Sequence, residues 1–243
     1  MQIYHLNAET CLFAFDELPD YMTYVASIIR NHTLYLIDTF LGPDSMKEIM
    51  TFLNQQFSFN RVIIINTHYH FDHIWGNCYF PDCTIIAHQK CKENMQKFFS
   101  EEYQKQQCLC QGQVSMRLPN RTFKHSILLE DDLLAFYSPG HTSDSISVYD
   151  LKNKVLFAGD NLEKPLLHIE NDDLNAYLKT LENYQKLAPE TITSGHTLLL
   201  DMKDVLQSID YIKSLIFHTN LQLEESQKDI HQENIDFLLR DMK

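Results

Sequence analysis

The stretch that decides the fold reads Arg61-Val-Ile-Ile-Ile-Asn-Thr-His-Tyr-His-Phe-Asp-His-Ile-Trp75. Its apolar residues 62–65 predict a buried strand, and the polar residues that follow lie where this strand ends in a loop. The loop brings imidazoles and one carboxylate close together, at His68, His70, Asp72 and His73. Such a cluster is typical of a metal site, although a solvated loop that happens to be rich in histidine would have the same composition.

The spacing of these residues divides them into two pairs. Side chains two positions apart in an extended segment point the same way, so His68 and His70 can reach one point in space. Asp72 and His73, which lie past the bend, would face a second point nearby. Imidazole nitrogen and carboxylate oxygen suit zinc, iron or manganese, whereas calcium and magnesium prefer oxygen alone.

Length and charge limit the class of protein. The chain has 243 residues and no linker rich in Pro, Gly or Ser, so we expect a single domain over residues 1–243 with a substantial core. Lys and Arg number 20 against 33 Asp and Glu, which gives a formal net charge of -13. This balance argues against nucleic acid or an anionic membrane as the main partner, although a local basic groove stays open.

Cysteine usage and hydropathy predict the compartment. The six cysteines show no paired zinc-knuckle spacing, and Cys108-Leu-Cys110 is the one close pair. The N-terminus has no signal-peptide pattern, and no apolar run reaches about 18 residues. We therefore expect a soluble, cytoplasmic protein whose thiols stay reduced.

The first half of the chain alternates strands and helices. Strands are predicted at 3–6, 11–15, 24–29, 34–37 and 84–87, with a helix over 43–57. Asp38 follows one of these strands directly. It is either an ordinary loop acid or a carboxylate that orients a ligand histidine through the second ring nitrogen of that histidine.

Residues 89–124 differ in character from the segments on either side. They are polar, rich in glutamine over 104–113, and interrupted by Gly112 and Pro119. We interpret them as an insertion that either covers the site or forms a peripheral helical hairpin.

Three more strand ends in the second half carry residues of the same chemical kind. Strands are predicted at 126–129, 133–137, 146–149, 155–158 and 191–193, and helices after Asn171-Asp172, from about 201, and within 222–243. The segments that follow the strands are Gly140-His141-Thr142, Gly159-Asp160-Asn161 and Gly195-His196.

This order of motifs closely resembles the metallo-β-lactamase superfamily, and within it the glyoxalase II-like subgroup. The resemblance extends from Leu36 to His196. It implies an α+β fold, a four-layer αβ/βα sandwich, with the site at one edge of two packed sheets. It also implies two metal ions, taken as zinc with iron or manganese as alternatives. His68, His70 and His141 would hold the first ion, and Asp72, His73 and His196 the second.

The resemblance further implies that Asp160 bridges the two ions and that a hydroxide between them attacks the substrate. Asp72 and Asp160 are the two carboxylates expected to take part in the chemistry. Asp38 would support the ligands from behind. Candidate substrate contacts are Tyr69, Asn161, His88 and His168.

Departures from particular families narrow the function. The commonest β-lactamase subclass has cysteine in place of Asp160, and flavodiiron reductases have glutamate in place of His70. Glyoxalase II carries a basic helical C-terminal domain that holds the glutathione. Too little chain follows His196 here for the whole domain, although a partial version stays open. Long-chain nucleases need a basic exosite, which the net charge argues against.

The leading hypothesis is a dinuclear metal hydrolase that cleaves an ester-like bond in a small molecule, with thioester, lactone and phosphodiester substrates all open. One alternative is a mononuclear iron oxygenase of the persulfide dioxygenase type, which would bind iron through His68, His141 and Asp160. The other is a ligand-binding protein on the same fold without turnover. Neither the substrate nor the oligomeric state follows from the sequence.

Overall fold

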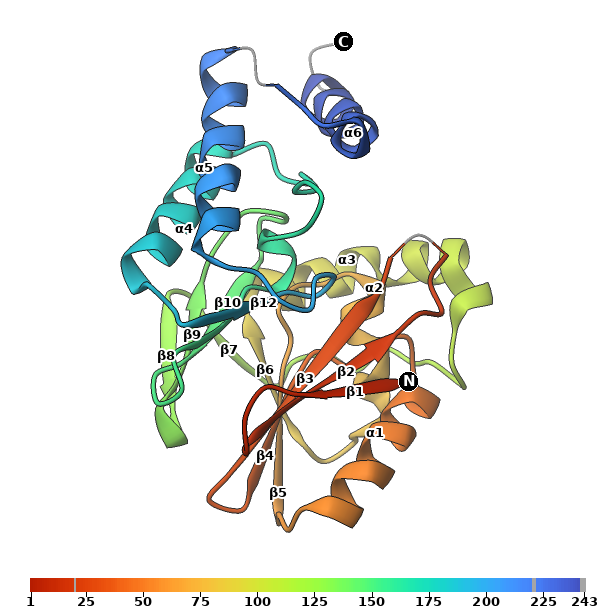
Figure 1. Cartoon of the computed structure of the whole chain (residues 1–243). Coiled ribbons are helices and arrows are strands. Elements are labelled where there is room, and N and C mark those ends of the chain that lie inside the picture. The colour runs from red at the N-terminus through yellow and green to blue at the C-terminus, as the bar shows by residue number, and fades with distance from the viewer. Residues whose placement is uncertain (20, 220–221, 241–243) are drawn as a thin grey trace. The chain divides into compact units, whose positions relative to one another are not determined.

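The computed structural model describes residues 1–19, 21–219 and 222–240 (Figure 1). The chain divides into two compact units, Met1–Asp131 and Asp132–Lys243. Each is described by itself below. The single domain expected over 1–243 stays a prediction.

The first unit contains a sheet of seven strands in the order β1-β2-β3-β4-β5-β6-β7. Strands β1 to β4 form an antiparallel meander, and β4, β5, β6 and β7 are parallel neighbours. The strands are β1 Gln2–His5, β2 Thr10–Phe15, β3 Thr23–Arg30, β4 Thr33–Ile37, β5 Arg61–Ile65, β6 Thr84–His88 and β7 Arg121–Phe123. The meander and the central strand agree with the sequence prediction.

The register of the parallel strands sets the position of the histidine loop. Ile37 of β4 pairs with Ile65 of β5, and Ile65 pairs with Ile86 of β6. The carboxyl ends of parallel strands that are in register meet at one edge of the sheet, where loops carry function. Asp38, directly after β4, therefore lies beside the loop that follows β5, and its backbone N–H donates to the carbonyl of Ile65 at 2.9 Å.

Helices of the first unit bury one face each. Helix α1 (Pro43–Gln56) starts with proline, which suits the first helical turn, and buries Met46, Ile49, Met50 and Leu53 as the spacing predicts. The short helix α2 (Phe71–Ile74) and the 3-10 helix Trp75–Tyr79 follow the histidine loop. Helix α3 (Gln89–Gln106) and the 3-10 helix Gln107–Leu109 fill most of the segment interpreted as an insertion.

The first unit has its own hydrophobic core. It includes Phe13 and Leu36 of the sheet, Met46 of α1, Trp75, and Met95 of α3. Strand β8 (Ser126–Leu129) is the last strand of this unit, and a 3-10 helix, Glu130–Asp132, follows it at the unit boundary.

In the second unit, strands β12, β11, β10 and β9 are neighbours in that order. Their bounds are β9 Leu133–Tyr137, β10 Ile146–Asp150, β11 Val155–Phe157 and β12 Thr191–Thr193. Strand β10 is antiparallel to β9 and β11, whereas β11 and β12 are parallel. The parallel pair brings the segments after Phe157 and Thr193 to the same edge.

Helices α4 (Leu174–Leu187) and α5 (Met202–Phe217) pack side by side in the second unit (Figure 1). The sequence placed the cap of α4 at Asn171-Asp172, and this was wrong by one residue. Asp173 is the N-cap, because its side chain accepts from the backbone N–H of Ala176 at 2.9 Å. Helix α5 begins as predicted, after Asp201, with a capping box closed by Asp204.

A second core lies within the second unit. It includes Leu156, Tyr177, Leu181, Ile209 and Ile212, and the last helix, α6 (Lys228–Leu239), adds partly buried side chains to it. Residues 241–243 of the predicted C-terminal helical segment lie outside the described residues. Among the helices described, none combines the length and apolar character needed to cross a bilayer.

Candidate metal centre

The histidine loop of the first unit holds its donor atoms in two close pairs. The Nε2 atom of His68 lies 3.0 Å from Nδ1 of His70. The Nε2 atom of His73 lies 3.5 Å from Oδ2 of Asp72. His68, Asp72 and His73 are buried, and His70 is half-buried. Side-chain alternation predicts that His68 and His70 lie together, and Asp72 and His73 lie past the bend.

Asp38 orients two of these imidazoles from behind. Its Oδ2 lies 2.9 Å from Nδ1 of His73, and its two oxygens accept from the backbone N–H and the hydroxyl of Thr67, both at 2.7 Å. Since the Thr67 hydroxyl donates its proton to Asp38, its oxygen can only accept from Nδ1 of His68, 3.0 Å away. In both histidines Nδ1 is therefore directed toward the Asp38 network, and Nε2 faces the other donors.

Burial raises the pKa of the Asp38 carboxyl above its ordinary value, while the neighbouring His73 and the hydrogen bonds from Thr67 act in the opposite direction. These contacts offset part of the cost of burying the carboxylate. These are the contacts expected for a carboxylate that supports a ligand histidine. The Thr67 relay to His68 was not foreseen.

In the second unit, His141 has a defined tautomer. Its Nδ1 lies 2.9 Å from the backbone carbonyl oxygen of His168, which can only accept, so Nδ1 carries the proton. Nε2 then keeps its lone pair and lies 3.8 Å from Oδ2 of Asp160. An imidazole held in this way is ready to ligate a metal through Nε2.

Asp160 lies between two histidines of the second unit. Its Oδ2 is 3.1 Å from Nε2 of His196 and 3.8 Å from Nε2 of His141. Glu163 joins this group, because ligand atoms of Asp160, Glu163 and His196 all lie within 4.8 Å of one another. Sequence reasoning missed Glu163, although its place three residues after Asp160 on the same strand exit could have pointed to it.

Asn161 positions the His141 turn. Its side chain is fully buried, accepts from the backbone N–H of His141 at 2.8 Å, and donates to the carbonyl of Ser138 at 2.8 Å and to the Tyr184 hydroxyl at 3.0 Å. Its backbone carbonyl accepts from the Tyr177 hydroxyl at 3.1 Å. These contacts give Asn161 a structural task, and its expected contact with substrate stays a prediction.

The other candidate substrate contacts lie in different settings. Tyr69 is half-buried and packs between His70 and Phe98 of α3, with ring centroids 4.6 and 5.4 Å apart. Helix α3 thus contacts the histidine loop. His168 is half-buried, and its Nδ1 lies 2.6 Å from Oε2 of Glu163, which raises the pKa of His168.

His88 caps helix α3. Its Nε2 lies 3.0 Å from the carbonyl oxygen of Lys124, and its Nδ1 accepts from the backbone N–H of Lys90 at 3.2 Å. Only the neutral ring satisfies both contacts, and burial also lowers the pKa of His88. Both ring nitrogens are thus engaged in structural bonds, and its contact with a substrate stays a prediction.

The donors of each unit fit a transition-metal cation. A tetrahedral zinc ion with Zn–N bonds of about 2.0–2.1 Å separates two ligand nitrogens by roughly 3.3 Å, close to the spacing of His68 and His70. Histidines backed by a carboxylate or a carbonyl, together with buried carboxylates, suit zinc, iron or manganese better than calcium or magnesium.

Comparison with known families adds one match over most of the chain. A profile described as the metallo-beta-lactamase superfamily matches residues 19–196, a range that includes every metal-ligand candidate of both units. The matched range ends at His196.

Solved structures with the same fold share little sequence with this chain. The DIM-1 metallo-β-lactamase exposed to ceftazidime superposes with a TM-score of 0.73 at 15% identity, covering 88% of this chain and 97% of that one. TMB-1 gives 0.71 at 16% identity, covering 88% and 98%. A metallo-β-lactamase from Hirschia baltica gives 0.70 at 18% identity, covering 87% and 96%. The expected α+β fold class of metallo-β-lactamase type is therefore confirmed.

Proposed function

Because the chain belongs to the metallo-β-lactamase superfamily, we propose that it is a dinuclear metal-dependent hydrolase that cleaves an ester-like bond in a small molecule. The superfamily and the His/Asp donors support a metal-dependent hydrolase. The dinuclear site, zinc as the metal and the ester-like substrate are parts of the proposal. So is the cytoplasmic location that the sequence predicts.

The proposal takes the ligand set that the resemblance implies. His68, His70 and His141 hold one ion, Asp72, His73 and His196 hold the other, and Asp160 bridges them. Support comes from the second unit alone, where one oxygen of Asp160 lies near Nε2 of both His141 and His196. A bridging carboxylate needs such a position between ligands of two ions.

The observation that carries the proposal is the orientation of the imidazoles. Asp38 and the His168 carbonyl fix Nδ1 of His73 and His141, so that Nε2 of each ring is presented as a donor. A histidine that only filled space would not need a buried carboxylate behind it. Pre-oriented donors reduce the reorganisation that metal binding requires.

The chemistry that two bound zinc ions supply in such a site is acidification of a water molecule, to a pKa of about 7, and polarisation of the scissile carbonyl or phosphoryl oxygen. The residues of the chain hold the donors rigidly and keep bulk water from them, since most are buried. Hydrolysis adds the elements of water across the bond. A thioester then gives an acid and a thiol, a lactone gives a hydroxy acid, and a phosphodiester gives a phosphate monoester and an alcohol.

The test combines metal analysis with a substrate screen. The full chain is purified with zinc, iron or manganese in the medium, its metal content is measured, and thioesters, lactones, phosphodiesters and a β-lactam are assayed. Two metal ions per chain with turnover of an ester-like substrate would support the proposal. One iron per chain with oxygen uptake, or two metals with no turnover of any compound in the panel, would overturn it.

A further inference from the structure

Glu163 connects the candidate metal centre with a cavity in the second unit. Its side chain is only 5% exposed. On one side its carboxylate lies within 4.8 Å of ligand atoms of Asp160 and His196. Its Oε2 also lies 2.6 Å from Nδ1 of His168. On the other side it borders a cavity of about 450 Å³. A buried carboxylate at this junction has a ligand-sized space in front of it.

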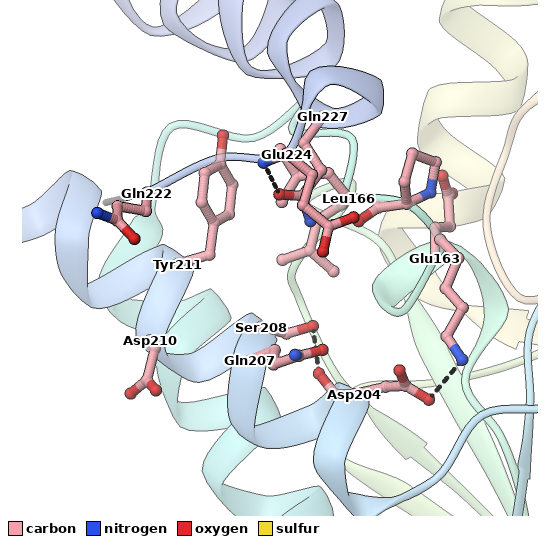
Figure 2. Close-up of a pocket in the computed structure, with 13 residues that line it drawn as sticks. Glu163, Leu166, Asp204, Gln207, Ser208, Asp210, Tyr211, Gln222, Glu224 and Gln227 are labelled. Atoms are coloured by element: carbon pink, nitrogen blue, oxygen red, sulfur yellow. Dashed lines mark hydrogen bonds and ion pairs between the residues drawn. The ribbon is translucent and has the colours of Figure 1, made fainter. Parts of the chain in front are cut away.

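The cavity lies among helix α5, the loop 163–167 and the segment that leads into α6 (Figure 2). Its volume is within the range of small-molecule sites, about 300–1,000 Å³. Buried Leu166 and Leu167 supply an apolar part, and Tyr211 and Ser208 contribute from α5. The space therefore combines an aliphatic surface with polar groups.

Its lining is strongly acidic. Among the described residues that line it, the acids are Glu163, Asp204, Asp210 and Glu224. Among the same residues Lys164 is the one with a basic side chain, and its Nζ lies 3.0 Å from Oδ2 of Asp204. Lys164 thus pairs with Asp204 and His168 pairs with Glu163, so Asp210 and Glu224 carry the remaining negative charge of the lining. An anionic ligand would be repelled, and a neutral one would gain less from these carboxylates than a cation would.

The loop that carries Glu163 is anchored, so the position of the carboxylate is fixed. Asn234 of α6 accepts from the backbone N–H of Ile169 at 2.8 Å and donates to the carbonyl of Leu167 at 2.7 Å. Gln227 donates to the carbonyl of Pro165 at 2.9 Å. A specificity residue needs such support, because a loosely held side chain discriminates poorly.

We propose that this cavity binds the cationic end of the substrate, a primary amine or guanidinium on a short aliphatic chain, and that Glu163 is the carboxylate that recognises it beside the metal donors. This inference rests on the proposed function, since it names the class of compound that the hydrolase cleaves. The aliphatic chain would lie along Leu166 and Leu167. The charged end would form a charge-assisted hydrogen bond with Glu163.

The test measures binding without turnover, so that it does not depend on the hydrolase being active. The full chain, as purified and after chelation, is titrated by calorimetry with butylguanidinium, pentanol and hexanoate. We expect binding of butylguanidinium only. Glu163→Gln should weaken it about 10-fold, the loss typical of a hydrogen bond to a charged group. Asp210→Asn, an exposed change on α5, should weaken it about 3-fold through the charge alone.

Glu190→Gln is the matched control. Glu190 is exposed and pairs with Lys154 away from the lining residues, so this variant should bind butylguanidinium like the original chain. Equal binding of the three probes, or unchanged binding in both Glu163→Gln and Asp210→Asn, would overturn the proposal. So would loss of metal from Glu163→Gln with cation binding intact, because Glu163 would then serve the metal site. If Glu163→Gln does not fold, the affinity of Asp210→Asn for butylguanidinium decides whether the proposal stands.

The two proposals fail in different ways. If butylguanidinium binds in a way that depends on Glu163 but no ester-like compound is hydrolysed, the proposed hydrolase activity is refuted and the proposed cation-binding site is supported. Hydrolysis of neutral esters with no binding of butylguanidinium would refute the cation site and keep the hydrolase. With a cationic substrate in hand, Glu163→Gln should raise the KM for that substrate more than the KM for a neutral analogue of the same length.

Discussion

Nδ1 of His141 lies 2.9 Å from the carbonyl oxygen of His168 and so carries the ring proton. The same loop places the His168 side chain against Glu163 and is held by Asn234. A single backbone segment thus orients a candidate ligand histidine and carries a carboxylate that lines the neighbouring cavity. Substitutions that weaken the anchoring of this segment should therefore affect both His141 and Glu163.

Asp160→Ala and His70→Ala should each abolish hydrolysis and lower the metal content. Asp160 lies near two histidines, and the His70 ring nitrogen lies 3.0 Å from that of His68, so either change removes a donor from the proposed centre. Activity assays and elemental analysis measure the two effects. His125→Ala, at an exposed histidine, is the control and should change neither. Full activity in either donor variant would refute the assigned roles.

Asp38→Asn should have a smaller effect, a loss of about 10-fold to 100-fold in metal affinity, because outer partners of ligand histidines typically contribute that much. Asparagine tolerates the left-handed backbone at this position, where φ is 64°. Competition with a metal-binding dye measures the affinity. Asp16→Asn, at an exposed acid, should bind metal normally. An unchanged metal affinity in Asp38→Asn would mean that Asp38 does not support metal binding.

Gly140→Ala should destabilise the second unit by about 1–3 kcal/mol, as overpacking of a filled core does. A Cβ at this position would lie 2.4 Å from Oδ1 of Asn161 and 2.6 Å from the Tyr177 ring. The turn would have to shift, and the bond from the His141 N–H to Asn161 would weaken. Urea unfolding gives the stability, and metal titration gives the effect on His141. A variant as stable as the original would show that the turn relaxes easily.

The fold was largely predictable, because it depends on hydrophobic periodicity. The strands before Asp38, His68 and Asp160 were predicted from apolar runs alone, and the structure has them at nearly the same residues. Parallel register then explains why residues far apart in sequence meet within a unit, as Asp38 and His73 do.

The supporting contacts were not predictable, because they depend on which side of a loop faces the interior. Asn161 and Glu163 follow the same strand, and nothing in their local sequence distinguishes the one that anchors a turn from the one that borders a cavity. His88 was a candidate pocket residue because it ends a strand, but its capping bond to Lys90 needs the exact start of α3. Tertiary packing decides such cases.

His88→Asn should reduce the loss of stability in mild acid. The folded pKa of His88 lies below the ordinary 6.5, mainly through burial, so the unfolded chain takes up the proton first as the pH falls. The stability that neutral His88 contributes is therefore complete at pH values above the ordinary pKa of 6.5, and it decreases as the pH drops toward the folded pKa. Asparagine can still cap α3 without titrating.

Urea unfolding at about pH 8 and about pH 5.5 tests this, on either side of the ordinary histidine pKa. Any advantage of the original chain over His88→Asn should be smaller at the lower pH. An advantage that is constant with pH would mean that His88 does not titrate differently in the folded chain. His125→Asn, at an exposed histidine, controls for the loss of a titrating ring.

Asn234→Ala should lower stability by about 3 kcal/mol, since buried backbone groups of residues 167 and 169 lose their partner. It should also increase hydrogen exchange in the loop 163–169 and protease cleavage near α6. Gln232→Ala, which removes only an exposed contact with Asp236, is the control. Equal exchange in the two variants would show that α6 does not hold the loop.

The anchoring of this loop by Asn234 also bears on the order of events during synthesis. A ribosome makes the His141 turn and the 163–169 loop well before Asn234 emerges, and until then the loop lacks its buried partner. We expect the nascent chain to bind metal poorly at this end and to acquire its full set of oriented donors only when α6 has docked. The His141 turn would then reach its final orientation only after α6 has been synthesised and has docked.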